Sequence, residues 1–236
     1  PGDYTLTTTD GTAEQLAARH WRWTAPERAG VATLRFRGPA SDDVITLRAF
    51  VMVPASAVKN GSLNGYRIGQ YPGPRANPLY RPPEGYVEVT RDNQHTRVSP
   101  HFELGQFVCK EDAPSAFPKY VVVREQLPLT LEAVLERVEA IGFRADALHI
   151  MSAYRTPYYN HAIGDVKYSM HQFGGAADVY VDRMPDVKIL FDQVEALMSA
   201  DGTRPIRGGL GLYPGTTVHP PFVHVDVRGK AARWHG

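Results

Sequence analysis

Two segments of the chain carry histidine and carboxylate side chains at spacings that suit metal binding. In the first, His171 and Asp178 are seven residues apart, and two glycines and two alanines lie between them. Such small residues allow a tight turn and close backbone packing, so the two side chains can converge from a loop and the strand that follows it. Imidazole and carboxylate are ligands that suit zinc. The alternative interpretation is a Gly-rich turn with a capping aspartate.

The second segment is the stretch 219–228, which reads as a strand with polar residues in step. Side chains alternate along a strand, so we expect His224, Asp226 and Arg228 to share one face, with valines on the other. This pattern predicts a sheet with one chemically active surface. An ordinary half-exposed strand with an Asp–Arg ion pair is the alternative.

The composition restricts what such a site can contain. The chain has 236 residues with nine histidines and a single cysteine, Cys109, which excludes an intramolecular disulfide and a Cys-based structural zinc site. A transition metal would therefore take histidine and carboxylate ligands. With 26 Lys+Arg against 25 Asp+Glu and no basic run, the sequence gives no indication of nucleic-acid binding. Six histidines lie in no ligand-like spacing and are expected to be structural or exposed: His20, His95, His101, His149, His161 and His235.

Periodic apolar residues predict the elements that must position these side chains. Apolar residues at helical spacing indicate a helix over 130–141, ended by Gly142, and a second helix over 186–199. Strands are expected at 148–153, 179–181 and 222–227. Helices mixed with well-separated strands indicate an α+β domain that covers about 95–236.

The N-terminal part has a different pattern. Alternation between residues 31 and 54 predicts strands, and so a small β-rich module. Five prolines in the twelve residues 72–83 exclude a helix or a central strand there and indicate a linker or a surface-hugging segment. We therefore divide the chain into a β-rich module with a Pro-rich linker, 1–80, whose function the sequence does not indicate, and the α+β domain.

The pattern SxHxxGxAxD is met by Ser169, His171, Gly174, Ala176 and Asp178. Together with two further segments, this pattern resembles the signature of the peptidase M15 family. The family includes zinc D-Ala-D-Ala carboxypeptidases and phage endolysin peptidases, and hedgehog domains share its fold. Segment 152–160 is similar to the family's S-G-Y-R-[ST]-x-x-x-N stretch, and segment 222–229, with Arg233 and Trp234 after it, resembles the closing strand of the bacterial cell-wall subfamily. The resemblance covers about 99–236.

The resemblance implies a hedgehog/DD-peptidase-like domain, with an antiparallel sheet and flanking helices, that holds one zinc ion. The implied ligands are His171, Asp178 and His224, with a fourth position for water. Arg155 is implied to bind the substrate carboxylate or to steady the developing oxyanion. Ser169 is expected to support the site by a hydrogen bond to a ligand or to substrate.

The general base is where the sequence departs from the family pattern. Many relatives carry Glu or Asp three residues before the last histidine ligand, where this chain has Pro221. The remaining candidates are His219, Asp226, and water activated by zinc alone. We favour His219 because an imidazole ordinarily titrates near neutrality. Asp226 is either the base or the partner that orients His224.

The implied activity is that of a zinc-dependent peptidase acting on peptidoglycan stem or cross-link peptides, as a carboxypeptidase or an endopeptidase. The alternative is a zinc-containing binding domain without turnover, which Pro221 favours. A third possibility is that residues 1–80 anchor the chain to a cell-wall polymer or partner, which would make the protein chiefly a scaffold. The chain contains no stretch of about 18 apolar residues that would span a membrane. It opens at Pro1 with no Met, as a processed or trimmed chain does, and we expect an extracytoplasmic location.

Overall fold

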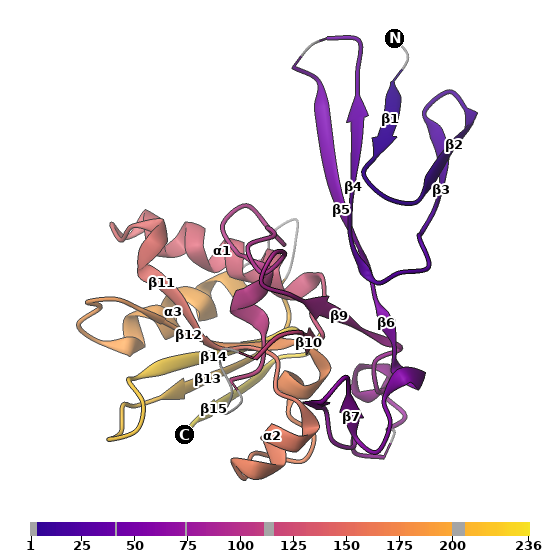
Figure 1. Ribbon diagram of the computed structural model, residues 1–236. Coiled ribbons are helices and arrows are strands. Elements are labelled where there is room, and N and C mark those ends of the chain that lie inside the picture. The colour runs from indigo at the N-terminus through magenta and orange to yellow at the C-terminus, as the bar shows by residue number, and fades with distance from the viewer. Residues whose placement is uncertain (1–3, 41, 74, 111–115, 200–205) are drawn as a thin grey trace. The chain divides into compact units, whose positions relative to one another are not determined.

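The computed structural model describes residues 4–40, 42–73, 75–110, 116–199 and 206–236. Contacts divide the chain into two compact units (Figure 1). The first contains the residues up to Ala57 together with Gly85–Glu88, and the second contains Val58–Glu84 and the residues from Val89 onward. The sequence placed residues 58–80 with the N-terminal module, whereas their contacts are with the second unit.

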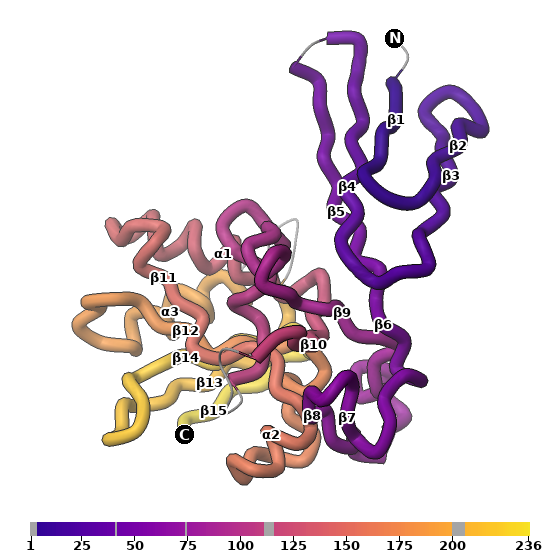
Figure 2. The backbone as a smooth tube through the Cα atoms, viewed as in Figure 1, coloured from indigo at the N-terminus to yellow at the C-terminus, as the bar shows by residue number. Residues whose placement is uncertain are grey.

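The first unit is built from antiparallel strands (Figure 2). Its three-stranded sheet has the order β1-β4-β5, and a separate hairpin is formed by β2 and β3. The bounds are Thr5–Thr8 (β1), Thr12–Ala17 (β2), His20–Thr24 (β3), Gly30–Arg37 (β4), Val44–Val51 (β5) and Val53–Pro54 (β6), with a 3-10 helix at Ala55–Ala57 (η1). Strand β6 pairs with the start of β9, Gly85–Val89. The predicted strands between residues 31 and 54 correspond to β4, β5 and β6.

The second unit has a five-stranded sheet of order β11-β12-β14-β13-β15. Its strands are Leu148–Ser152 (β11), Ala176–Val181 (β12), Gly209–Tyr213 (β13), Phe222–Asp226 (β14) and Ala232–His235 (β15). All neighbours are antiparallel except β13 and β15, which are parallel. Helix α3, Val187–Ser199, packs across β12, β13 and β14, and helix α1, Gln126–Ala140, packs against α3. This arrangement confirms the predicted α+β class.

Helix α1 begins four residues before the predicted range because Pro128 is tolerated there. A proline in the first turn of a helix removes only an N–H that has no intrahelical partner, so the helix can start at Gln126. The remaining elements of the second unit are short. They are β7 (Ser62–Leu63), β8 (Tyr66–Arg67), β10 (Lys119–Val121), α2 (Pro157–Ala162), and the 3-10 helices η2 (Pro78–Tyr80), η3 (Leu104–Phe107), η4 (Ala145–Ala147) and η5 (Met170–Phe173).

The Pro-rich segment lies on the second unit instead of acting as a free linker. Tyr80 packs its ring against that of Phe173 with centroids 5.5 Å apart. The guanidinium of Arg124 donates to the carbonyl of Leu79 at 2.6 Å. Of the two sequence alternatives for this segment, these contacts support the surface-hugging one.

In the described parts of the chain, no helix is both long enough and apolar enough to cross a membrane.

Candidate functional site

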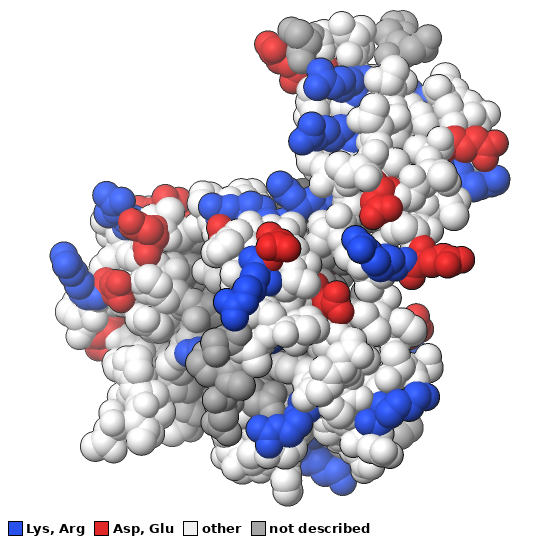
Figure 3. Space-filling model, viewed as in Figure 1, with Lys and Arg blue, Asp and Glu red and all other residues white. Residues whose placement is uncertain are grey.

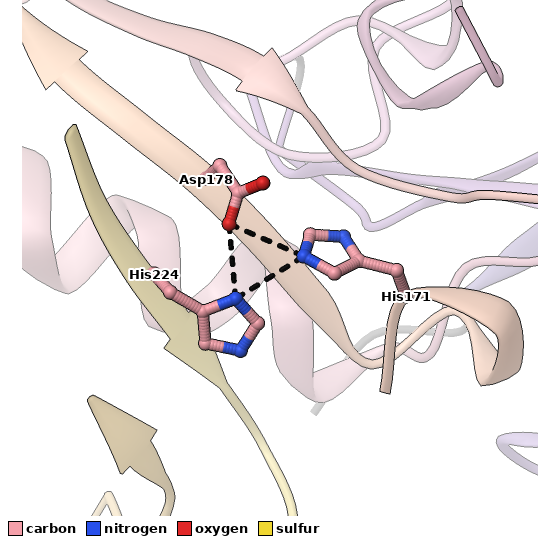
Figure 4. Close-up of side chains that lie close together, drawn as sticks. All are labelled: His171, Asp178 and His224. Atoms are coloured by element: carbon pink, nitrogen blue, oxygen red, sulfur yellow. Dashed lines mark hydrogen bonds and ion pairs between the residues drawn. The ribbon is translucent and has the colours of Figure 1, made fainter. Parts of the chain in front are cut away.

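Three elements of the second unit bring His171, Asp178 and His224 together (Figure 4). His171 lies in η5, Asp178 in β12 and His224 in β14. Asp178 and His224 are directly opposite each other in the antiparallel register, which places their Cβ atoms about 5 Å apart on one face. The turn between η5 and β12 needs Gly174, whose φ is +65° and where a Cβ would overlap the carbonyl of Val122.

The three ligand atoms have the spacing that one metal ion requires. The Nε2 atom of His171 lies 3.2 Å from Oδ1 of Asp178 and 3.1 Å from Nδ1 of His224. The same Nδ1 atom lies 2.9 Å from Oδ1 of Asp178. A tetrahedral zinc ion with bonds of about 2.0–2.2 Å separates its ligand atoms by about 3.3 Å. All three side chains are buried, so the residues present fit a zinc ion with small adjustments.

Each histidine is oriented by a hydrogen bond on the side of its ring away from the cluster. The Nδ1 atom of His171 lies 2.5 Å from the carbonyl oxygen of Ala153, to which its N–H donates. The Nε2 atom of His224 lies 3.2 Å from Oδ2 of Asp226. These bonds orient the rings so that Nε2 of His171 and Nδ1 of His224 are the nitrogens that face the cluster.

Arg155 orients Asp178, the third residue of the cluster. Its guanidinium donates to Oδ2 of Asp178, which leaves Oδ1 for the cluster. It also donates to Oδ2 of Asp165 at 2.8 Å and to the hydroxyl of Ser152 at 3.1 Å. The sequence predicted a substrate-binding or oxyanion role for Arg155. The structure places the side chain at the site but pairs its charge with two carboxylates.

The charged forms in the cluster follow from burial and hydrogen bonding. Burial lowers the pKa of His171, the effect of nearby Asp178 being too small to reverse this. Burial works against the charged form of Asp178, but the two histidines outweigh it and hold the pKa of this carboxyl well below its usual range. Burial also disfavours charged His224, yet hydrogen bonds to Asp178 and Asp226 raise its pKa to about 9. Asp178 is therefore present as the carboxylate, the form that binds metal.

Asp226 lies behind the ring of His224 as seen from the cluster. Its side chain is fully buried, and it accepts hydrogen bonds from the backbone N–H of Gly209 at 2.9 Å and from the guanidinium of Arg228. Burial opposes ionisation, but the bonds from His224 and Arg228 hold its pKa well below the usual range. This geometry supports orientation of His224 and does not support the role of a base.

A cleft of about 710 Å³ opens onto the cluster. Besides the three clustered side chains, it is lined by Arg155, Ser169 and His219. Ser169 directly precedes η5 and is buried. The Nδ1 atom of His219 lies 2.9 Å from the carbonyl oxygen of Pro220, and the ring packs edge-on against Phe222. The predicted site residues therefore share one cleft, apart from Asp226 at its back.

An aromatic wall that the sequence did not single out lines the same cleft. Tyr213 stacks on Phe222 with ring centroids 4.6 Å apart, and the indole N–H of Trp234 donates to the hydroxyl of Tyr213 at 2.8 Å. Gly211 lies between His224 and Trp234 in the sheet register, and a Cβ there would lie 2.5 Å from the Trp234 indole nitrogen. The sequence feature that could have indicated this wall is the pair Gly209 and Gly211 in β13, because glycine in a strand leaves room for large neighbouring side chains.

The six other histidines lie outside the cluster. Three of them pair singly with carboxylates: His95 with Glu103, His101 with Glu132, and His149 with Asp182. Within the described residues, the only group of three or more potential metal ligands is His171, Asp178 and His224.

Comparison with known proteins agrees with this geometry. Residues 116–226 match the family model described as Peptidase M15, a range that includes all three clustered residues. No curated protein and no solved structure matched the chain significantly. The region 116–226 of this chain therefore belongs to the peptidase M15 family.

Proposed function

We propose that the protein is a zinc-dependent peptidase that hydrolyses peptide bonds in peptidoglycan stem or cross-link peptides. The family match implies a hydrolytic peptidase, and peptidases of this family are generally zinc-dependent. The observation that supports the metal is the buried His171–Asp178–His224 cluster, in which an outside hydrogen bond orients every ligand. Bound zinc would act as a Lewis acid and lower the pKa of its water toward about 7.

We assign the proton transfers to His219. With its Nδ1–H donating to the carbonyl of Pro220, the Nε2 atom is left to accept a proton in the cleft and return it to the leaving amine. Phe222 supports the ring from the side. Many relatives carry an acidic residue at the position of Pro221, and His219 would take over the role of general base from that residue.

Arg155 and Asp226 act in this proposal mainly as positioning residues. Arg155 orients Asp178, and as a residue that lines the cleft it would also donate a hydrogen bond to a substrate carboxylate or a developing oxyanion. Asp226 keeps His224 in its ligating tautomer. Ser169 is placed to hydrogen bond to bound substrate from the rim of η5.

The peptidoglycan assignment and the hedgehog/DD-peptidase arrangement of the domain rest on the resemblance to the family. The cleft fits a short peptide, since aromatic rings line it together with the charged side chains of Arg155 and Asp165. Because peptidoglycan lies outside the cytoplasmic membrane, this substrate entails an extracytoplasmic location. Figure 3 shows basic and acidic side chains interspersed on the visible face of the second unit, which gives no support to a polyanionic partner there.

Zinc content and hydrolysis measured on the same preparations test the proposal. His171→Ala and His224→Ala should lose both zinc and the cleavage of purified muropeptides. His219→Ala should keep zinc and lose about 10²–10⁴-fold in rate. His149→Ala is the matched control, because His149 pairs with Asp182 outside the cleft. Mass spectrometry of the products separates release of a terminal residue from cleavage of a cross-link.

Two results would contradict the proposal. Stoichiometric zinc without cleavage over a broad pH range would favour the alternative, a zinc-containing binding domain. Full turnover by the His219→Ala variant would show that the base assignment is wrong, while leaving the metal site intact.

A further inference from the structure

We propose that Tyr71, which directly precedes the Pro-rich segment 72–83, is a positioning residue for the metal cluster. The inference rests on the proposed zinc site. The hydroxyl of Tyr71 lies 2.9 Å from that of Tyr154, whose side chain is only 1% exposed. Tyr154 stands between Ala153 and Arg155, the two residues that orient His171 and Asp178. A contact at Tyr154 therefore affects the hydrogen bonds that orient both His171 and Asp178.

The stretch 153–155 forms hydrogen bonds to the cluster residues through both its backbone and a side chain. The carbonyl of Ala153 accepts the ring N–H of His171, and the backbone N–H of Arg155 donates to the carbonyl of His171 at 3.2 Å. The guanidinium of Arg155 holds Asp178. A shift of this stretch would therefore move the imidazole of His171 and the carboxylate of Asp178 together.

Tyr71 also contacts the other side of the His171 loop. Its ring packs against Phe173 in η5, with centroids 5.7 Å apart, and Tyr80 packs against the same ring at 5.5 Å. Phe173 is buried and lies two residues after His171. Tyr71 therefore connects the stretch that accepts the His171 hydrogen bond with the helix that carries His171.

The segment that carries Tyr71 is itself fixed in place. Just before it, the carbonyl of Ile68 accepts the backbone N–H of Tyr158 at 3.0 Å, and Gly69, with φ of +82°, packs backbone against backbone on Tyr158. After it, the hydroxyl of Tyr168 donates to the carbonyl of Gly73 at 3.0 Å. Pro72 limits the backbone directly beside Tyr71. All of these residues up to Gly73 precede the range matched by the family model.

The test is Tyr71→Phe in the full chain, which removes the hydroxyl and keeps the ring. Partners that directly hold a metal ligand change metal affinity by about 10- to 100-fold when mutated, and Tyr71 acts one contact further out. We expect zinc to bind about 3- to 10-fold more weakly in a chelator competition, and the visible absorption of the Co²⁺-loaded protein to change. Tyr71→Leu, which also removes the ring contact with Phe173, should weaken binding further.

The matched control is Tyr158→Phe. Its hydroxyl accepts a hydrogen bond from Arg67 at 2.6 Å, so this variant also loses one bond to the 58–84 segment, but not one to the stretch 153–155. The control should keep wild-type zinc affinity and Co²⁺ absorption, and the metal-free Tyr71→Phe protein should unfold at about the same temperature as the control.

Unchanged zinc affinity and Co²⁺ absorption in Tyr71→Phe would overturn the inference. So would an equal loss in Tyr158→Phe, because the effect would then be one of general stability. If the wild-type protein binds neither Zn²⁺ nor Co²⁺, the proposed function fails instead, and the two failures are distinguished.

Discussion

At the scale of single residues, the proposed metal site depends on the hydrogen-bond partners of His171, Asp178 and His224 as much as on these three side chains. His171, Asp178 and His224 each direct one atom into the cluster because a hydrogen bond occupies the other side of the group. Such outside bonds fix the ring orientation of an imidazole and the free oxygen of a carboxylate before a metal binds. The cluster is therefore preorganised, and substitutions at the partners should affect metal binding without removing a ligand.

Asp226→Asn tests this dependence with little change in volume. The amide keeps one acceptor but loses the charge that holds the Nε2–H of His224, so we expect zinc affinity to fall by about 10-fold or more. Chelator competition measures the change. Asp192→Asn is the control, because Asp192 forms an exposed ion pair with Lys188 on α3. Zinc affinity unchanged in both variants would show that Asp226 does not orient the ligand.

Glu132 gives a pH-dependent prediction away from the metal. Its carboxylate accepts the backbone N–H of His101 at 2.7 Å and pairs with the His101 ring at 2.7 Å. Burial opposes ionisation, but the hydrogen bonds from the backbone and the ring of His101 lower the pKa of Glu132. Because the folded pKa lies below the unfolded one, the stabilisation is present above the unfolded value of about 4.3 and is lost as pH falls through the folded value.

Glu132→Gln should therefore lower the free energy of unfolding by about 1 kcal/mol at pH 7. The difference from wild type should shrink as the pH falls from the unfolded pKa of about 4.3 through the lower folded pKa, where the folded carboxylate becomes protonated. Urea unfolding at a series of pH values measures both effects. Glu136→Gln, on the exposed face of the same helix, is the control and should change stability little at either pH. A constant difference across the series would rule out the charged interaction as its cause.

At the scale of elements, local sequence patterns predicted the helices and the turn before Asp178, because these features depend on residues close together in the chain. Apolar spacing placed α1 and α3 within a few residues, and small residues before Asp178 indicated the turn that carries His171. The register that sets Asp178 opposite His224 was not predictable, since it follows from packing of the whole sheet. The role of the Ala153 carbonyl as the acceptor for His171 was not predictable either, because every residue has a backbone carbonyl whatever its type.

Strand β13 supports the site through glycines that make room for larger groups. The backbone N–H of Gly209 donates to Asp226 at 2.9 Å, and a Cβ at this buried position would overlap the Asp226 carboxylate. Gly209→Ala must therefore displace Asp226 or β13. We expect a loss of about 1–3 kcal/mol in unfolding free energy, together with weaker zinc binding, measured by thermal unfolding and chelator competition.

The matched control for that substitution is Gly73→Ala. A Cβ at Gly73 would meet no atom within 4 Å, so stability and zinc affinity should stay close to wild type. Wild-type stability in Gly209→Ala would mean that β13 relaxes without cost, and that its glycines are not needed to hold Asp226.

At the scale of the whole molecule, the boundary between the two compact units differs from the boundary between the two ranges expected from sequence. The segment 58–84 belongs with the second unit, although its prolines suggested a linker. Its contribution was hidden because Tyr71, Tyr80 and the carbonyl of Leu79 act through contacts more than 40 residues away in sequence. The first unit, up to Ala57, has its own sheet and remains a candidate for attachment to the cell wall.

Truncation separates these roles. A chain that starts at Val58 loses β6, the partner of β9, but keeps the contacts of Tyr71, Tyr80 and Leu79 with Phe173 and Arg124. It should bind zinc and cleave soluble muropeptides like the full chain. A chain that starts at residue 95 loses the ring contacts of Tyr71 and Tyr80 with Phe173, and it leaves half-buried Arg124 without the carbonyl of Leu79. Aromatic pairs contribute about 0.5–1.5 kcal/mol each, and a lost hydrogen bond to a charged group costs about 1.5–3 kcal/mol. The second truncation should therefore lower the free energy of unfolding by at least about 2.5 kcal/mol and weaken zinc binding, as calorimetry and chelator competition would show. Equal stability of the two truncated chains would mean that the segment is a linker after all, because its contacts would then contribute nothing that the rest of the second unit needs.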